Sequence, residues 1–189
     1  MSAAMSIALE QDATAARQRS ALLLTWAVTA AWDFLCASAL AVFGYHSTVA
    51  RLWQGVAATV LGARAAQLGG RGIAVGLALH LMVALTWSAL FVGLLARSSA
   101  LRRVVRRPSG ALAVAAVYGP VIWLVMSCAV IPLATGRPPT FGFRWWVQVF
   151  AHLPFVTLPL VFTARRAMGL DARPARSDTW EQAFPTPPE

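Results

Sequence analysis

Three ionisable side chains, Asp33, His80 and His152, interrupt long apolar stretches of this sequence. Ionisable groups inside a membrane are costly, so they usually face a helix-bundle interior, a cavity or one another. One carboxylate and two imidazoles form a plausible ligand set for a divalent metal ion, and the same groups can relay a proton. If the apolar stretches are membrane spans, these three residues are the candidate site of any chemistry.

The composition indicates a membrane protein rather than a soluble one. Of the 189 residues, 58% are hydrophobic and 12% are charged, and the mean hydropathy is +0.63. A soluble domain has about 45 to 50% apolar and about 25% charged residues. The formal net charge of +9 comes from 16 basic residues, all arginine. Because these arginines lie between apolar blocks, they predict membrane topology and not nucleic-acid binding.

Four apolar blocks predict four transmembrane helices, because about 20 apolar residues let a helix cross a hydrocarbon core of about 30 Å. The polar residues 1–20 show no sustained helical period and are expected to form a cytoplasmic N-terminal segment that is at most partly helical. The proline-rich residues 167–189 are expected to form a disordered cytoplasmic tail. The sequence therefore predicts an all-α integral membrane protein whose membrane domain, residues 21–166, is a four-helix bundle. Its expected spans are residues 21–44, 72–96, 110–134 and 144–164.

The segment between the first two predicted spans is ambiguous. Apolar residues recur at helical spacing from Val49 to Ala63, but Arg51 and Arg64 interrupt the pattern. An arginine at mid-bilayer costs about 2.5 to 3.5 kcal/mol. We therefore expect residues 49–68 to form an interfacial amphipathic helix or a re-entrant one, with a fifth span as the alternative.

Small residues open the second predicted span. Gly72 and Gly76 are four residues apart, a spacing that lets a neighbouring helix pack closely. Small-residue faces of this kind also allow a homo-oligomer in the lipid bilayer. The motif predicts packing and no particular function.

The arginine distribution predicts the orientation. Five arginines lie within residues 97–109, and arginine-rich short loops mark the cytoplasmic side of a membrane. With four spans and both termini cytoplasmic, eleven arginines lie inside and five outside. A five-span chain with its N-terminus outside also keeps this loop inside, but it exposes Arg17 and Arg19 and brings Arg51 and Arg64 close to the bilayer. Four spans are the better prediction.

The three candidate residues allow three interpretations. Counted from the outer interface at about 1.5 Å per residue, His80 and His152 lie about 12 Å deep and Asp33 about 17 Å deep, so they can meet. They can form a proton relay or a divalent-metal site, the histidines can be axial ligands of a haem b, or all three can form an interhelical hydrogen-bonded cluster. No HExxH, CxxC, phosphate-binding loop or Ser-His-Asp grouping is visible. The sequence therefore requires no cofactor, and an enzyme is neither indicated nor excluded.

Prolines interrupt the last two predicted spans, at Pro120, Pro132, Pro154 and Pro159. A proline inside a helix frees a backbone carbonyl and can kink the helix. Such kinks line cavities in transporters but also occur in plain bundles.

A pattern of motifs runs through the last third of the chain. It consists of Ile131-Pro132-Leu133, Pro138-Pro139, Trp145-Trp146, Ala151-His152 and a closing Arg165-Arg166. The pattern resembles the terminal part of the YagU-like bacterial inner-membrane proteins, with alanine where that family tends to have glycine before the histidine. The resemblance implies a prokaryotic inner-membrane protein without a settled activity, and His152 is the residue that corresponds.

These observations lead to two functional expectations. The first is a multi-pass inner-membrane protein with a structural or stress-related role and no catalysis. The alternative is a small transporter, or a proton- or metal-handling protein that uses Asp33, His80 and His152.

Overall fold

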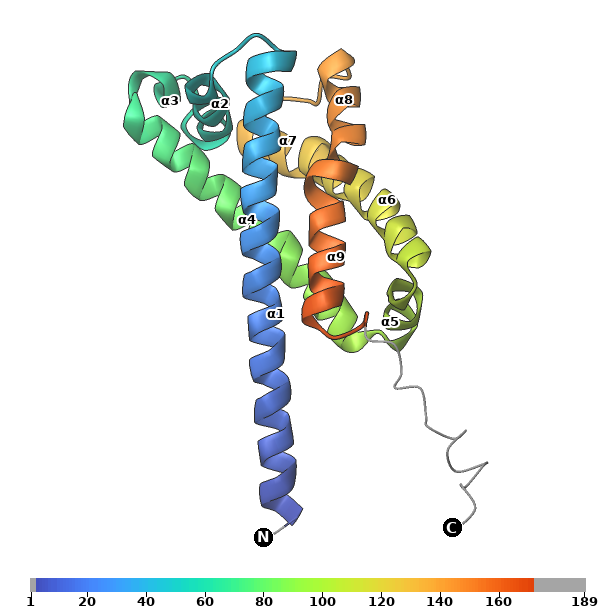
Figure 1. Cartoon of the computed structure of the whole chain (residues 1–189). Helices are drawn as coiled ribbons and strands as arrows, with labels where there is room; N and C mark the ends of the chain where they lie inside the picture. The colour runs from blue at the N-terminus through green and yellow to red at the C-terminus, as the bar shows by residue number, and fades with distance from the viewer. Residues whose placement is uncertain (1–2, 172–189) are drawn as a thin grey trace, which may run out of the picture.

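The computed structural model describes residues 3–171, and every regular element in this part of the chain is helical (Figure 1). Four continuous helical stretches are long and apolar enough to cross a membrane, by length and composition: Ala8–Gly44, Gly70–Arg97, Pro108–Thr135 and Phe143–Ala167. This confirms the predicted all-helical architecture with four apolar helices of spanning length. Each end lies within about three residues of its predicted position, except the first.

The four long helices are built from different elements. The first is α1 (Ala3–Ala39) with a π-helical last turn, η1 (Leu40–Gly44), and the second is the single helix α4 (Gly70–Arg97). The third and fourth each contain a π-helical turn between two α-helices. They consist of α6 (Pro108–Val125), η2 (Met126–Val130) and α7 (Ile131–Thr135), and of α8 (Phe143–His152), η3 (Leu153–Thr157) and α9 (Leu158–Ala167). Three shorter helices connect them: α2 (Val49–Leu61), α3 (Arg64–Gln67) and α5 (Ser99–Arg106).

Helix α1 begins well before the first predicted span. No glycine or proline occurs from Ala3 to Phe43, and alanine, the strongest helix former, recurs throughout. Nothing therefore ends the helix before Gly44, whose missing side chain raises the entropic cost of helix. Residues 3–20, predicted as a polar lead with no sustained helical period, continue the helix and project away from the other helices (Figure 1).

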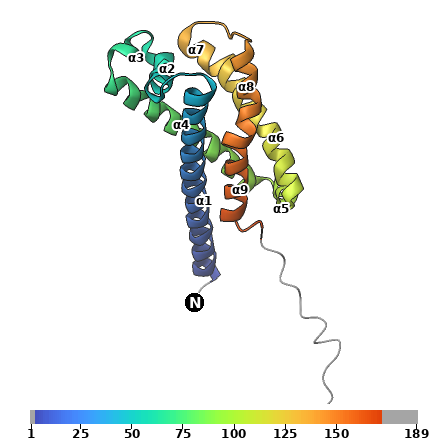
Figure 2. The same ribbon diagram turned by 45° about the horizontal axis from the view of Figure 1, so that its top comes forward.

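The long helices pack around α1 and α6. Helix α1 packs against α4 and α9, and α6 packs against α8, η3 and α9; Figure 2 shows this arrangement from a second direction. The main apolar core lies where α4, α5, α6 and α9 meet, around the inaccessible side chains of Phe91, Leu95, Val105, Leu160 and Val161. Elsewhere, large apolar side chains are exposed on every long helix. Such exposure is expected of a surface that faces lipid.

The ambiguous segment between the first two long helices folds as two short helices. Helix α2 has 13 residues, which is too few for a fifth span. Figure 1 shows it nearly end-on beside α1, so it lies across the bundle. The Thr48 hydroxyl caps α2 by accepting a hydrogen bond from the backbone N–H of Arg51 at 3.1 Å. Gly62, with φ of 57°, separates α2 from α3.

The two short helices α2 and α3 pack against Gly72 and Gly76 of α4. Both glycines are buried, and a Cβ atom would overlap the Ala65 carbonyl oxygen at Gly72 and the Trp53 carbonyl oxygen at Gly76. The predicted close packing at this motif is therefore present, and the neighbour is the α2–α3 segment. Because the α2–α3 segment covers this face of α4, a second copy of the chain would have to pack against a different face.

The arginine-rich segment expected to be a loop contains helix α5. The Ser98 hydroxyl caps this helix by accepting a hydrogen bond from the Leu101 N–H at 3.1 Å. Arg102 donates two hydrogen bonds to the carbonyls of Leu95 and Ala96, at 2.7 and 2.9 Å. These carbonyls belong to the last turn of α4, where a cation is favourable. Helix α5 buries Val105 and keeps most of its arginines at the surface.

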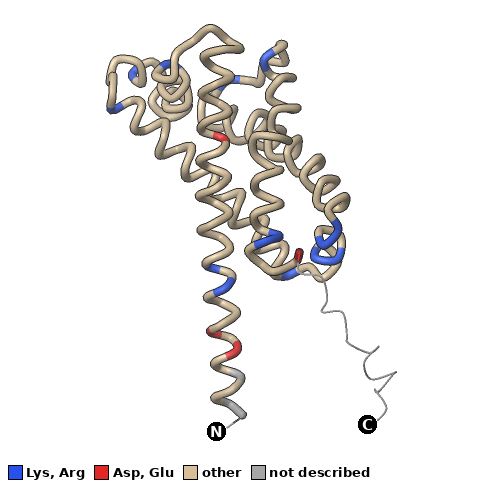
Figure 3. Tube along the Cα trace, in the orientation of Figure 1, with Lys and Arg blue, Asp and Glu red and all other residues tan. Residues whose placement is uncertain are grey.

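The arginines gather at the two ends of the bundle. In Figure 3 the blue segments of α1, α5 and α9 lie at a similar height, and a second group lies at the opposite end, over the α2–α3 region and the connection that leads into α8. The helical middle of the molecule between them carries one acidic segment. This distribution is the one expected when a bilayer crosses the middle.

Two of the π-helical turns coincide with prolines. A proline ring displaces the carbonyl four residues before it. For Pro132 this residue is Cys128, inside η2, and for Pro159 it is Phe155, inside η3. A π-turn is wider than an α-turn and accommodates the displaced carbonyl without ending the helix. The predicted distortions at these two prolines thus take the form of π-turns.

Candidate functional site

Asp33 of α1 and His80 of α4 face each other. The Oδ2 atom of Asp33 lies 3.6 Å from Nδ1 of His80, and the two side chains are 26% and 11% exposed. The other imidazole nitrogen of His80, Nε2, lies 3.1 Å from the carbonyl oxygen of Ala30. Because Ala30 and Asp33 are three residues apart in one helix, both contacts hold the His80 ring against the same face of α1.

The contact with Ala30 places one proton on His80. A carbonyl oxygen only accepts hydrogen bonds, so Nε2 of His80 carries the proton that it donates to Ala30. Its Nδ1 atom faces the Asp33 carboxyl group at 3.6 Å, which is longer than a hydrogen bond. The pair therefore brings together two groups that can each take up or release a proton, a carboxyl group and an imidazole.

Two stacked aromatic side chains extend this pair, and one of them contacts His80. The Trp53 ring of α2 lies edge-on to His80, with 4.9 Å between ring centroids, and is stacked on Phe34 at 5.2 Å. Trp53 is 2% exposed, so the site is formed by α1, α2 and α4 together. The sequence interpretation placed Trp53 in an apolar helix face and missed its contact with the site. The available signal is that Gly76 and His80 lie one turn apart on α4, where the glycine admits the backbone of Trp53.

His152 belongs to a different cluster. Its Nδ1 atom donates to the carbonyl oxygen of Gln148, in its own helix, at 2.7 Å. Its ring lies 5.1 Å from the ring of Trp123 of α6, which in turn lies 6.4 Å from Trp145. Within residues 3–171, no group of three or more His, Cys, Asp or Glu side chains has the arrangement of a metal site. The structure thus brings Asp33 and His80 together and leaves His152 apart from them.

The separation of His152 has a simple geometric cause. Depth along the membrane normal gives the height of a residue but not its direction around the helix axis. Helix α1 does contact the turn that follows His152, where Trp32 donates to the Pro154 carbonyl at 3.1 Å. The His152 ring, however, lies against Trp123 of α6, whereas the site on α1 is formed with α4 and α2. Equal depth therefore allowed a contact that the directions of the side chains do not make. A haem held between His80 and His152 does not fit this arrangement, because the His80 ring lies against Trp53 and the His152 ring against Trp123, in different clusters.

The structure and sequence have no counterpart in the comparisons with known proteins. No family model matches the chain. No curated protein matches it, and no solved structure does. The resemblance to the YagU-like proteins, and the correspondence of His152 that it implies, stay predictions.

Proposed function

We propose that this protein spans a bacterial cytoplasmic membrane four times and has a structural role, without catalysis. Both termini lie on the cytoplasmic side, and α2 lies in the opposite interface. The distribution of arginine supports this orientation, because nine of the arginines in residues 3–171 are on α1, α5, α9 and the ends that join them, against five at the other end. The richer end is the cytoplasmic one by the positive-inside rule.

The observation that carries the structural role is how the polar side chains of the long helices are used. Each of the four long helices is joined to another by a hydrogen bond from a side chain to a backbone carbonyl. The bonds run from Trp26 Nε1 to Leu81 (2.9 Å), Trp32 Nε1 to Pro154 (3.1 Å), His80 Nε2 to Ala30 (3.1 Å), the Tyr118 hydroxyl to Trp87 (3.1 Å) and the Thr157 hydroxyl to Ala115 (2.8 Å).

Interhelical hydrogen bonds of this kind suit a helix bundle that is surrounded by lipid. Lipid gives little hydrophobic drive for helix association, so interhelical hydrogen bonds, worth about 0.6 kcal/mol each on average, help to set which helices pair. His80 of α4 takes part in this pattern through its hydrogen bond to Ala30 of α1. Asp33, also on α1, lies against the same imidazole. The Asp33–His80 pair therefore acts first as a link between α1 and α4.

The alternative function is proton handling at the same pair. It is favoured by one specific observation, the approach of the Asp33 carboxyl group to within 3.6 Å of the His80 imidazole. A resident divalent metal is less well supported, because only these two of the three expected ligands converge. In this alternative, Asp33 and His80 exchange a proton with water on either side of the membrane.

One experiment separates the two functions. The full chain and its Asp33→Asn variant are reconstituted in vesicles that enclose a pH-sensitive dye, and proton flux is followed after a pH jump; thermal unfolding is measured on the same preparations in detergent. A structural role gives no flux above empty vesicles and a lower unfolding temperature for Asp33→Asn. A flux in the wild type that Asp33→Asn abolishes, while the variant stays folded, would overturn the structural role in favour of proton handling.

A further inference from the structure

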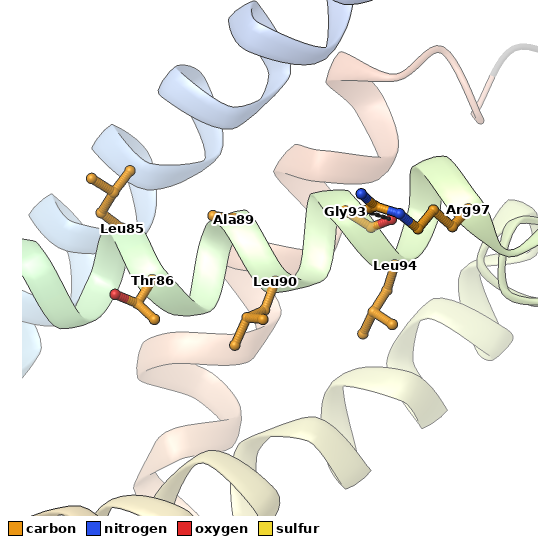
Figure 4. A pocket seen from close by; sticks show the side chains of 7 residues that line it. All are labelled: Leu85, Thr86, Ala89, Leu90, Gly93, Leu94 and Arg97. Atoms are coloured by element: carbon orange, nitrogen blue, oxygen red, sulfur yellow. Dashed lines mark hydrogen bonds between the residues drawn. The ribbon is translucent and has the colours of Figure 1, made fainter.

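Helix α4 leaves one face uncovered in the half that leads to the arginine-rich end. Its residues between Leu85 and Arg97 line an apolar surface groove of about 520 Å³ (Figure 4). Leu90 and Leu94 are each 50% exposed along this face. Figure 4 shows the Arg97 side chain at the end of the row, folded back toward Gly93. The groove is therefore an apolar strip that terminates in a cation.

The strip has the length of one bilayer leaflet. Leu85 and Leu94 are nine residues apart, which is about 14 Å at 1.5 Å per residue. Half of a hydrocarbon core is about 15 Å. Arg97 follows nearly one turn later, at the C-terminal end of α4, so it lies where the headgroups would be. An extended acyl chain matches this strip in length and in polarity.

Arg97, at this end of the groove, makes no ion pair with an acidic side chain of the described residues. The Arg97 guanidinium is exposed and donates only to the carbonyl oxygen of Gly93, at 3.4 Å. The one ion pair within residues 3–171 is the distant contact between α1 and α4. Helix α5 starts two residues after Arg97 and exposes Arg103 and Arg106. Guanidinium groups bind phosphate oxygens in a bidentate way, so this end is suited to a phosphate.

We propose that the groove is a binding site for an anionic phospholipid. One acyl chain lies on the α4 strip between Leu85 and Leu94, and the phosphate is bound by Arg97 with the neighbouring arginines of α5. Free phosphate would not use the apolar strip, and a zwitterionic lipid brings its own cation to a cluster that is already basic. The proposal rests on the proposed insertion of the chain into a membrane, and it does not depend on whether the protein moves protons.

Native mass spectrometry of the full chain in mild detergent tests the site. The chain is titrated with phosphatidylglycerol, with phosphatidylcholine of the same acyl chains, and with inorganic phosphate. We expect retained adducts with phosphatidylglycerol at lower concentration than with phosphatidylcholine, and none with phosphate. The Arg97→Gln variant should weaken phosphatidylglycerol binding about fivefold, the effect of one arginine near an anionic headgroup, and Arg97→Lys should keep most of the affinity.

Two further variants distinguish lipid binding at this groove from nonspecific electrostatic attraction between anionic lipid and arginine. Ala89→Phe places a ring in the groove eight residues from Arg97, and should lower phosphatidylglycerol binding while the arginines are unchanged. Arg137→Gln is the matched control, since Arg137 lines a second surface groove of about 480 Å³ at the opposite end. It should leave phosphatidylglycerol binding unchanged.

Three results would overturn the site. They are equal binding of the two lipids, equal losses in Arg97→Gln and Arg137→Gln, and undiminished binding in a folded Ala89→Phe variant. A wild-type chain that remains in solution without detergent would instead overturn the proposed membrane insertion. The two failures are therefore distinguishable.

Discussion

At the scale of single residues, Asp33 and His80 should be energetically coupled. Their side chains are in contact at 3.6 Å, so Asp33→Asn and His80→Gln each remove part of the same interaction. We expect the double variant to be destabilised by less than the sum of the two single variants. The expected coupling is about 0.6 to 1.7 kcal/mol, the range for polar contacts between membrane helices. Unfolding in mixed detergent and SDS micelles measures the four free energies.

His152 supplies the control for this coupling. Its ring contacts Trp123 and its Nδ1 atom bonds to Gln148, so it shares no partner with Asp33. The effects of His152→Gln and Asp33→Asn should therefore add to within about 0.5 kcal/mol. A coupling as large as that between Asp33 and His80 would show that the three residues do form one cluster.

The sequence was sufficient to find the pair and insufficient to assemble the site. Apolar context and depth select Asp33 and His80, because an ionisable group in a span needs a partner. Depth says nothing about the direction of a side chain around its helix axis, so it could not separate His152, whose ring lies against Trp123, from the other two. It also could not show Trp53, whose contact with His80 depends on the close approach of α2 to α4 at Gly76.

At the scale of elements, the packing of α2 on α4 depends on Gly76. A Cβ atom at this position would overlap the Trp53 carbonyl oxygen, and backbone cannot yield as a flexible side chain can. We expect Gly76→Val to destabilise the protein by about 1 to 3 kcal/mol, the usual range for overpacking. The variant should also increase the exposure of Trp53, which is 2% exposed in the structure. Thermal unfolding and tryptophan fluorescence quenching measure these effects.

Gly55 is the matched control within α2. It is a helical glycine, but a Cβ atom there meets nothing within 4 Å. Gly55→Ala should therefore be neutral or should stabilise the protein by up to about 1 kcal/mol, since alanine is the better helix former. If Gly76→Val were as harmless as Gly55→Ala, the close approach of α2 and α4 would be refuted.

The elements themselves were predictable to different degrees. Four long apolar blocks give four long helices, because hydropathy over about 20 residues is a strong signal. Helix α5 was missed because five arginines in thirteen residues resemble a loop, although arginine is a good helix former and Ser98 provides a cap. The helical start of α1 was predicted only in part for a similar reason, since helix propensity without an apolar period gives a weak pattern.

At the scale of the whole molecule, the arrangement of arginine at two ends predicts one orientation. Green fluorescent protein fused to the C-terminus should fluoresce, and alkaline phosphatase fused there should be inactive, because both report a cytoplasmic end. Phosphatase inserted between α7 and α8, within residues 138–141, should be active. An N-terminal tag should be protected from added protease in intact spheroplasts. An accessible N-terminal tag would contradict four spans and favour a chain that begins outside.

The orientation should also depend on the segment that contains α5. Eleven arginines lie on the proposed cytoplasmic side and five on the other; replacing the five within residues 97–109 by glutamine leaves six against five. Orientation follows the difference in positive charge across short loops, so this variant should give a mixed population in which C-terminal phosphatase gains activity. The matched variant replaces the five arginines of the other side, at positions 51, 64, 71, 137 and 144, and should keep the wild-type orientation, because it increases the difference. If the two variants behaved alike, the orientation would be set by something other than the arginines, and the assignment of the α5 end to the cytoplasm would lose its basis.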